Sequence, residues 1–132
     1  MRLTTCGSYK FLTNPLDTYV GKSLEIYGEW SQGELNIISS LVHKNANILE
    51  VGSNIGAHTV FIAKEICPEG NVYAFEPRRV LFQNLCANLC INEISNVYTF
   101  QKALGSGLID HNQKMTVAAM QMADMKVCAH RS

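Results

Sequence analysis

Hydrophobic residues in the middle of the chain alternate between strand-like runs and helix-like spacing. Three short apolar runs are typical of buried strands, residues 47–51, 71–75 and 97–102. Two stretches between them carry apolar residues at helical spacing, residues 57–67 and 78–91. This alternation of strands and helices predicts an α/β fold with a mainly parallel sheet and right-handed crossovers.

A further helix is predicted before the first strand. Ser31 followed by Glu34 forms the S-x-x-E pattern of a capping box, and helical spacing of apolar residues continues to Val42. In such a box the glutamate holds the backbone amide of the serine, which gives Glu34 a structural role. We expect residues 1–46 to form a lead-in that ends in a helix.

The turn after the first predicted strand has the pattern of a ligand site. Glu50 lies near the end of that strand, and Gly52 and Gly56 bracket the turn. Open α/β sheets bind small molecules at the carboxyl ends of their strands, where glycines let a ligand approach the backbone. A dinucleotide fingerprint needs a glycine where this chain has Asn54, and no Gly-Lys-Ser/Thr follows, so NAD, FAD and a phosphate-binding loop are disfavoured.

A second acid follows the next strand. Glu76 ends the run NVYAFE, and an acid at the tip of the neighbouring strand can accept hydrogen bonds from both hydroxyls of a ribose. An adenosine-bearing ligand without phosphates is therefore expected.

Several segments together resemble the FkbM-type S-adenosylmethionine-dependent methyltransferases. They are ILEVGSNIGAHT, VYAFEP, a helix with Asn84, Asn88 and Asn92, NVYTFQKALG, and the upstream DTYVGKSLEIYGEWSQGEL. The resemblance covers residues 16–105. It implies a Rossmann-like class I methyltransferase fold in which residues 47–105 form the S-adenosylmethionine-binding half.

The resemblance also implies a set of cofactor-binding residues. The turn around the methionine end would use Glu50, Gly52, Ser53, Asn54, Gly56 and Thr59. Glu76 would bind the ribose and Pro77 would lie beside the adenine. The segment that passes the adenine ring would be Lys102, Ala103 and Leu104. Glu29 and Glu34 are further candidates for lining the cleft.

The implied reaction is transfer of a methyl group to an oxygen of a small molecule or a sugar-containing acceptor, and no residue is assigned as catalytic base. A different class of function stays open, in which the chain is a non-catalytic remnant that binds the cofactor weakly. Such a remnant could also be an interaction module that self-associates through an uncovered sheet edge.

The carboxyl-terminal part departs from this pattern. Each βα unit takes about 30 residues, so residues 47–132 have room for about three such units. The chain is therefore expected to stop halfway through the methyltransferase fold. Residues 106–132 form an atypical tail, in which Met115–Met125 has helical spacing. Two explanations stay open, an amphipathic helix that covers a sheet edge, and a truncated or frame-altered reading frame.

Other polar residues have structural interpretations. Asn54 could cap the following helix, and His58 is expected to be either a solvated residue or a residue of the helix start. Asn84, Asn88 and Asn92 are expected to mark a polar face or a helix end. Trp30 and Tyr27 are interpreted as packing residues, with a substrate platform as the alternative.

Composition changes this picture little. Lys and Arg number 11 and Asp and Glu number 11, so zero net charge gives no indication of a nucleic-acid partner. The amino terminus lacks the apolar core of a signal peptide and no run is long enough to span a membrane, so a cytoplasmic location is expected. Five cysteines without paired metal spacing are interpreted as reduced, buried thiols, with no metal site.

Overall fold

The computed structural model describes residues 1–104, 116–121 and 124–128. Its elements, in chain order, are β1 (Arg2–Cys6), β2 (Tyr9–Thr13), α1 (Val20–Tyr27), α2 (Gln32–Leu41), β3 (Asn47–Val51), α3 (Ala57–Phe61), the π-helical turn η1 (Ile62–Ile66), β4 (Asn71–Phe75), α4 (Arg79–Ile91), β5 (Val97–Phe100), β6 (Thr116–Gln121) and β7 (Asp124–Cys128).

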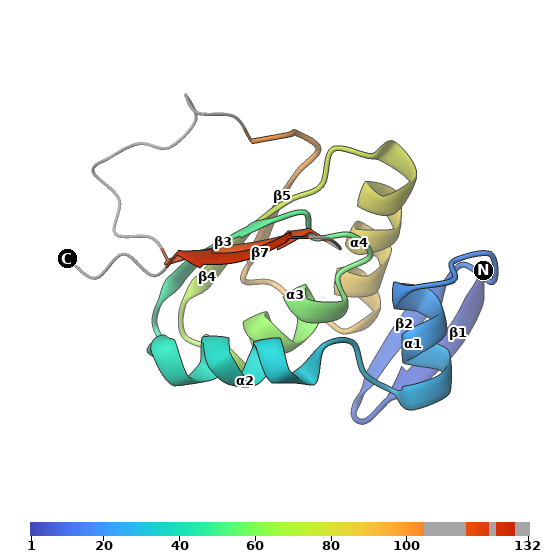
Figure 1. The fold of residues 1–132 in the computed structure, drawn as a ribbon, viewed down its shortest axis with the longest axis horizontal. Coiled ribbons are helices and arrows are strands. Elements are labelled where there is room, and N and C mark those ends of the chain that lie inside the picture. Colours follow the sequence, from blue (N-terminus) through green and yellow to red (C-terminus); the bar gives the residue numbers. More distant parts are fainter. Residues whose placement is uncertain (105–115, 122–123, 129–132) are drawn as a thin grey trace.

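A five-stranded sheet with the order β5-β4-β3-β6-β7 forms the centre of the protein (Figure 1). β3 pairs in parallel with β4 and β6, β4 pairs in parallel with β5, and β7 is antiparallel to β6. Within the described ranges β5 and β7 are therefore the edge strands of this sheet. The predicted α/β class and mainly parallel sheet are confirmed.

Side chains of the sheet alternate between two faces. Ile48 and Val72 pack with α2 and η1, and Ala74 packs with α3 and α4. The intervening positions carry stacked ring pairs, Tyr73 with Tyr98 at 5.4 Å and Phe75 with Phe100 at 4.7 Å between centroids. Because successive strand residues point to opposite faces, these rings lie on the face away from the helices.

The amino-terminal lead-in contains a β-hairpin that the sequence analysis missed. β1 and β2 pair antiparallel with Cys6 opposite Tyr9, so Gly7 and Ser8 form a two-residue turn, and Gly7 has φ 59°. Phe11 of β2 is fully buried in the same core as Val20 of α1. The Gly-Ser pair between two five-residue runs was the available signal for this hairpin.

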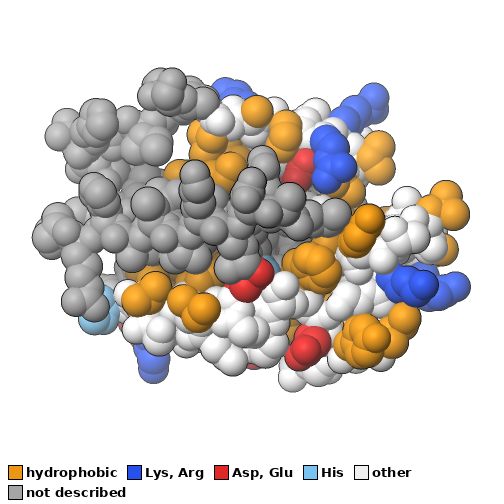
Figure 2. All heavy atoms as spheres, in the orientation of Figure 1, with side chains coloured by type: hydrophobic (Ala, Val, Ile, Leu, Met, Phe, Trp, Pro, Cys, Tyr) orange, Lys and Arg blue, Asp and Glu red, His pale blue; other side chains and the backbone are white. Residues whose placement is uncertain are grey.

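Several apolar side chains are exposed on the outer surface of the lead-in, among charged and polar ones. Figure 2 shows hydrophobic side chains at the right of the molecule, where Figure 1 places α1 and the hairpin. Those exposed by half or more are Met1, Leu3, Leu16, Tyr19, Ile26 and Tyr27. The packing interpretation is thus wrong for Tyr27, which is 75% exposed, and right for Trp30, which packs against the core.

The helix predicted in the tail is wrong. Thr116–Gln121 and Asp124–Cys128 are strands, and Thr116 to Ala119 pair in parallel with Ile48 to Val51. The backbone groups on that edge of β3 need partners, and pairing with β6 supplies them, so this requirement overrides the helical preference of Ala and Met. Met115 and residues 122–123 of the predicted helix lie outside the described residues.

Helices α2 and α4, and α3 together with η1, lie at the predicted positions, whereas α1 was not predicted. One start signal also works differently. α2 begins at Gln32 after Ser31, yet Ser31 has φ 49° and its side chain makes no capping hydrogen bond. Helix α2 therefore starts at the predicted place without the expected capping box. No helix in the described ranges combines the length and apolar character needed to cross a membrane.

Replacing Gly70 by alanine is expected to destabilise the fold. A Cβ at this position would overlap the backbone carbonyl of Ala46, so the turn before β4 would have to move. We expect a loss of about 1–3 kcal/mol in the free energy of unfolding, measured by urea denaturation. The control is Gly33→Ala in α2, where a Cβ meets nothing within 4 Å. That control should raise stability by about 0.5–1 kcal/mol, and equal effects of the two changes would contradict the close approach.

Candidate functional site

The predicted glycine turn lies between the ends of β3 and β4. The backbone amides of Gly52 and Ser53 both donate to the carbonyl of Phe75, at 2.8 and 3.0 Å. Gly52 has φ 76° and Gly56 has φ 87°, values that favour glycine at both positions. A Cβ on Gly56 would also meet Leu85 Cδ1 at 2.9 Å. Both glycines are therefore required by local geometry.

Glu76 ties the turn to the end of β4. Its Oε2 accepts the backbone amide of Asn54 at 3.0 Å, and its Oε1 accepts the amide of Arg78 at 2.9 Å. The side chain is 3% exposed. A carboxylate has about four acceptor positions, so both oxygens keep acceptor capacity for further donors. The structure thus brings Glu76 against the glycine turn, as its place in the sequence predicted.

Glu50 is buried directly below the same turn. Thr59 Oγ1 donates to Glu50 Oε2 at 2.7 Å, and both side chains have no exposed surface. Within the described part of the chain, Glu50 Oε1 and Ser53 Oγ are buried polar atoms that make no well-formed hydrogen bond, although the Ser53 hydroxyl lies close enough to Glu50 to influence it. Burial raises the pKa of Glu50 to about 7, and the hydroxyls of Thr59 and Ser53 oppose the rise.

Asn54 does not cap the following helix. Its side-chain oxygen accepts the amide of Ile55 at 2.8 Å, whereas α3 has Gly56 at its N-cap and no side-chain capping bond. Asn54 has φ 54°, a conformation that asparagine tolerates better than most residues. The capping alternative is therefore wrong, and Asn54 shapes the turn.

His58 lies in the first turn of α3, as expected, but its side chain is buried, so the alternative of a solvated residue is wrong. It is 1% exposed, its Nε2 lies 2.6 Å from the carbonyl oxygen of Trp30, and its Nδ1 lies 3.8 Å from Glu34 Oε2. Burial lowers its pKa to about 4, against the raising effect of hydrogen bonds to the Trp30 and Ser31 backbone. His58 thereby fixes the start of α3 to the lead-in as a neutral imidazole.

The other predicted residues lie at the carboxyl ends of the strands. The amide of Glu76 donates to the carbonyl of Phe100 at 3.1 Å, so the segment after β5 starts beside Glu76. Pro77, Lys102 and Ala103 are exposed there. Glu29 is exposed in the loop between α1 and α2.

The asparagines of α4 share a polar face, as expected, and Asn92 lies at the helix end as its C-cap. Asn84 and Asn88 are 7% and 0% exposed, so this face is buried, which the sequence did not reveal. Asn88 Nδ2 donates to the carbonyl of Ile55, inside the glycine turn, at 2.7 Å. Amides that recur every fourth residue on one helix were the only signal of this contact.

The cysteine interpretation is right in part. Cys6 and Cys67 are buried, but Cys90 is exposed on α4. Cys128 has a side chain outside the described set. Among the described side chains, no group of three or more His, Cys, Asp or Glu could hold a metal ion.

Solved methyltransferase structures resemble this fold, although no family model matches the chain. TYW2 of M. jannaschii in complex with AdoMet has a TM-score of 0.53 and 20% identity, over 74% of this chain and 41% of that protein. An rRNA methylase from Streptococcus thermophilus has a TM-score of 0.54 and 17% identity, over 67% of this chain and 47% of the other. Precorrin-6y C5,15-methyltransferase from Geobacter metallireducens GS-15 has a TM-score of 0.55 and 15% identity, over 74% of this chain and 46% of the other.

The chain thus spans less than half the length of each of these proteins. These likenesses show the fold, the Rossmann-like fold of class I methyltransferases. A curated protein, "Putative MucR family transcriptional regulatory protein y4pD" of Sinorhizobium fredii (strain NBRC 101917 / NGR234), is 72% identical over 29 residues. That match covers 22% of this chain and 17% of the regulator, too little to define a family.

The buried Glu50 and His58 are expected to give opposite pH dependences of stability. Glu50 has a pKa raised from 4.5 to about 7, so it binds a proton more tightly in the folded state and stability falls as pH rises through this window. His58 has a pKa lowered from 6.5 to about 4, so stability falls as pH drops through that window. Between pH 4.5 and 6.5 the two slopes oppose each other, each at most about 1.4 kcal/mol per pH unit.

Single variants should separate these two slopes. Relative to wild type, Glu50→Gln should become more stable as pH rises from 4.5 to 7, and His58→Asn should become less stable as pH rises from 4 to 6.5. Urea denaturation at half-unit steps of pH measures both. Profiles of wild type and variants that run parallel would show that neither group titrates as described.

Proposed function

We propose that this chain binds S-adenosylmethionine at the glycine turn and forms part of a methyltransferase of the FkbM type. The fold resembles that of methyltransferases, and one protein of similar fold, TYW2 of M. jannaschii, was solved in complex with AdoMet. The proposal also rests on the sequence resemblance over residues 16–105.

The observation that carries the proposal is a pair of buried polar atoms under the turn that face each other without a well-formed hydrogen bond. Glu50 Oε1 is an acceptor that fits an ammonium group, and Ser53 Oγ can donate to a carboxylate. An amino-acid end carries both of these groups. Unsatisfied buried polar atoms are rare in folded proteins, so a ligand that pairs with them is a physical reason for their position.

The remaining residues fit the nucleoside end. Glu76 has free acceptor capacity for the ribose hydroxyls, while Pro77 and Ala103 flank it on the chain segments that would border the adenine. The turn amides of Gly52 and Ser53 are already used by Phe75, which leaves few backbone donors for a pyrophosphate. A sulfonium nucleoside therefore suits this turn better than a dinucleotide.

The chemistry supplied by S-adenosylmethionine is an activated methyl group on a positively charged sulfur. Residues of this chain would hold it: Glu50 orients the amino-acid end, Thr59 fixes Glu50, and Glu76 fixes the ribose. Catalysis would then depend mainly on positioning an acceptor in line and excluding water.

For the acceptor, the FkbM resemblance favours an oxygen of a small molecule or of a sugar-containing product. The balanced charge of the chain gives no support for a nucleic-acid acceptor, although the similar structures include an rRNA methylase. The acceptor is therefore proposed to be a small molecule.

Binding of S-adenosylhomocysteine tests the proposal directly. Wild type should bind it in calorimetric titration. Glu76→Ala should weaken binding tenfold or more (about 1.4 kcal/mol) because it removes the ribose acceptor, and Gly52→Val should do the same because valine disfavours φ 76°. The control is Glu69→Ala, an exposed acid at the opposite ends of the strands. NAD binding in place of S-adenosylhomocysteine, or equal affinity in all four proteins, would refute the site.

Proton release on binding tests the role of Glu50. An ammonium group beside Glu50 Oε1 would favour the carboxylate and lower a pKa that stands at about 7 in the free protein. At pH 6, binding should therefore release close to one proton, seen by titration in buffers of different ionisation enthalpy. Glu50→Gln should bind more weakly and release none. Proton-neutral binding by wild type would place the ammonium group elsewhere.

A further inference from the structure

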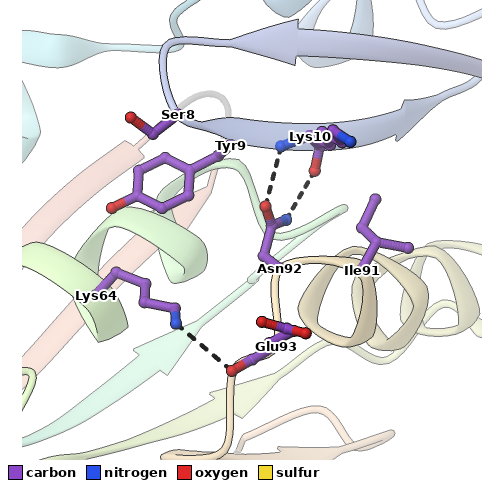
Figure 3. Close-up of a pocket in the computed structure, with 7 residues that line it drawn as sticks. All are labelled: Ser8, Tyr9, Lys10, Lys64, Ile91, Asn92 and Glu93. Carbon is purple, nitrogen blue, oxygen red and sulfur yellow. Dashed lines mark hydrogen bonds between the residues drawn. The ribbon is translucent and has the colours of Figure 1, made fainter.

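The amino-terminal hairpin is docked by side-chain amides in place of a strand. Lys10 and Leu12 of β2 are two residues apart, so their backbone groups point to the same edge, away from β1. Asn92 Oδ1 accepts the Lys10 amide at 2.9 Å and Asn92 Nδ2 donates to the Lys10 carbonyl at 2.7 Å (Figure 3). Asn88 repeats this at Leu12, where Oδ1 accepts at 2.7 Å and Nδ2 donates at 3.3 Å. Each amide offers a donor and an acceptor, as a peptide group would.

Asn88 differs from Asn92 in what else it touches. Asn88 is fully buried and its Nδ2 also donates to the carbonyl of Ile55 at 2.7 Å and to Asn84 Oδ1 at 3.2 Å. Asn92 instead donates to the carbonyl of Asn88 and lines a surface pocket of about 290 Å³ with Lys10, Lys64 and Glu93. Of these two amides, Asn88 therefore joins the hairpin to the glycine turn and Asn92 does not.

The hairpin fixes the orientation of the Asn88 amide. The Leu12 amide is a donor, so it requires Oδ1 on its side, and Nδ2 is then directed at the carbonyls of Leu12 and Ile55. A reversed amide would place Nδ2 against the donor of the Leu12 amide. It would also place Oδ1 against the carbonyl oxygens of Leu12 and Ile55, and such mismatches are costly in a buried site. Ile55 is itself 1% exposed, and its neighbour Asn54 is bound to Glu76. A shift at Leu12 would therefore be transmitted to the residues that surround the ligand.

We propose that Asn88 is a positioning residue that couples docking of the hairpin β1–β2 to cofactor affinity at the glycine turn. This inference rests on the proposed function, since the cofactor is S-adenosylmethionine. Coupling between two sites is reciprocal. Cofactor binding should therefore stabilise the docked hairpin, just as docking of the hairpin should raise the affinity for the cofactor.

The variant Asn88→Asp keeps the shape and the acceptor for Leu12 but replaces the donor that faces Ile55. Its affinity for S-adenosylhomocysteine should fall tenfold or more in calorimetric titration. Asn92→Asp is the matched control, since it changes the same kind of contact one turn further along α4 and does not touch the glycine turn. Its affinity should stay within twofold of wild type.

Amide hydrogen exchange of the wild-type protein tests the coupling directly, because a purely structural role of Asn88 would not make hairpin exchange depend on the ligand. Saturating S-adenosylhomocysteine should slow exchange in residues 9–13, and this ligand-dependent slowing should be lost in Asn88→Asp and kept in Asn92→Asp. Unchanged hairpin exchange in the wild type overturns the inference even if Asn88→Asp fails to fold, and so do equal affinities of the two variants. Failure of wild type to bind S-adenosylhomocysteine overturns the proposed function instead, and the inference with it.

Discussion

The structure depends on how the backbone from Gly52 to Gly56 is held from three sides. The end of β4 binds Gly52 and Ser53 through one carbonyl, Glu76 binds the amide of Asn54, and Asn88 of α4 binds the carbonyl of Ile55. Phe75 and Glu76 belong to the end of β4 and Asn88 belongs to α4, so the turn has its shape only when the sheet and α4 are assembled. A site built this way is organised before any ligand arrives, which reduces the entropy lost on binding.

The buried layer under the turn adds an electrostatic constraint. Glu50 and His58 are both enclosed, and burial favours the neutral form of each. Burial favours the protonated carboxyl group of Glu50 and the neutral imidazole of His58, so neither introduces an unpaired charge into the core. Among the described residues, the buried polar atoms that lack a well-formed hydrogen bond belong to Glu50 and Ser53, beside the turn itself.

The sequence predicted the central part of the fold well because local pattern and tertiary role agree there. β3 and β4 have the predicted bounds, since strands buried in a parallel sheet must be apolar throughout. The turn and Glu76 were identified for the same reason, because glycine and an acid at strand ends follow from local geometry. The resemblance to class I methyltransferases extended this to a fold that the structural likenesses support.

The errors arose where tertiary partners decide the outcome. Whether Thr116–Gln121 forms a helix or a strand depends on the edge of β3, and Asn88 is buried only because β2 lies against α4. His58 is likewise buried by Trp30, which lies 28 positions earlier in the chain. No window of neighbouring residues contains these partners, so periodicity alone could not reveal them.

The wide turn η1 has a consequence for how this region tolerates change. The amide of Cys67 bonds the carbonyl of Ile62, five residues back, so the segment holds one more residue than an α-helical turn would. Because the π-turn of η1 and an α-helical turn each close about one full turn, removal of one residue within Ile62–Ile66 would restore α-helical winding and keep α3 and the glycine turn aligned with β4. A deletion inside α3 or α4 would instead rotate the preceding part of the helix by about 100°.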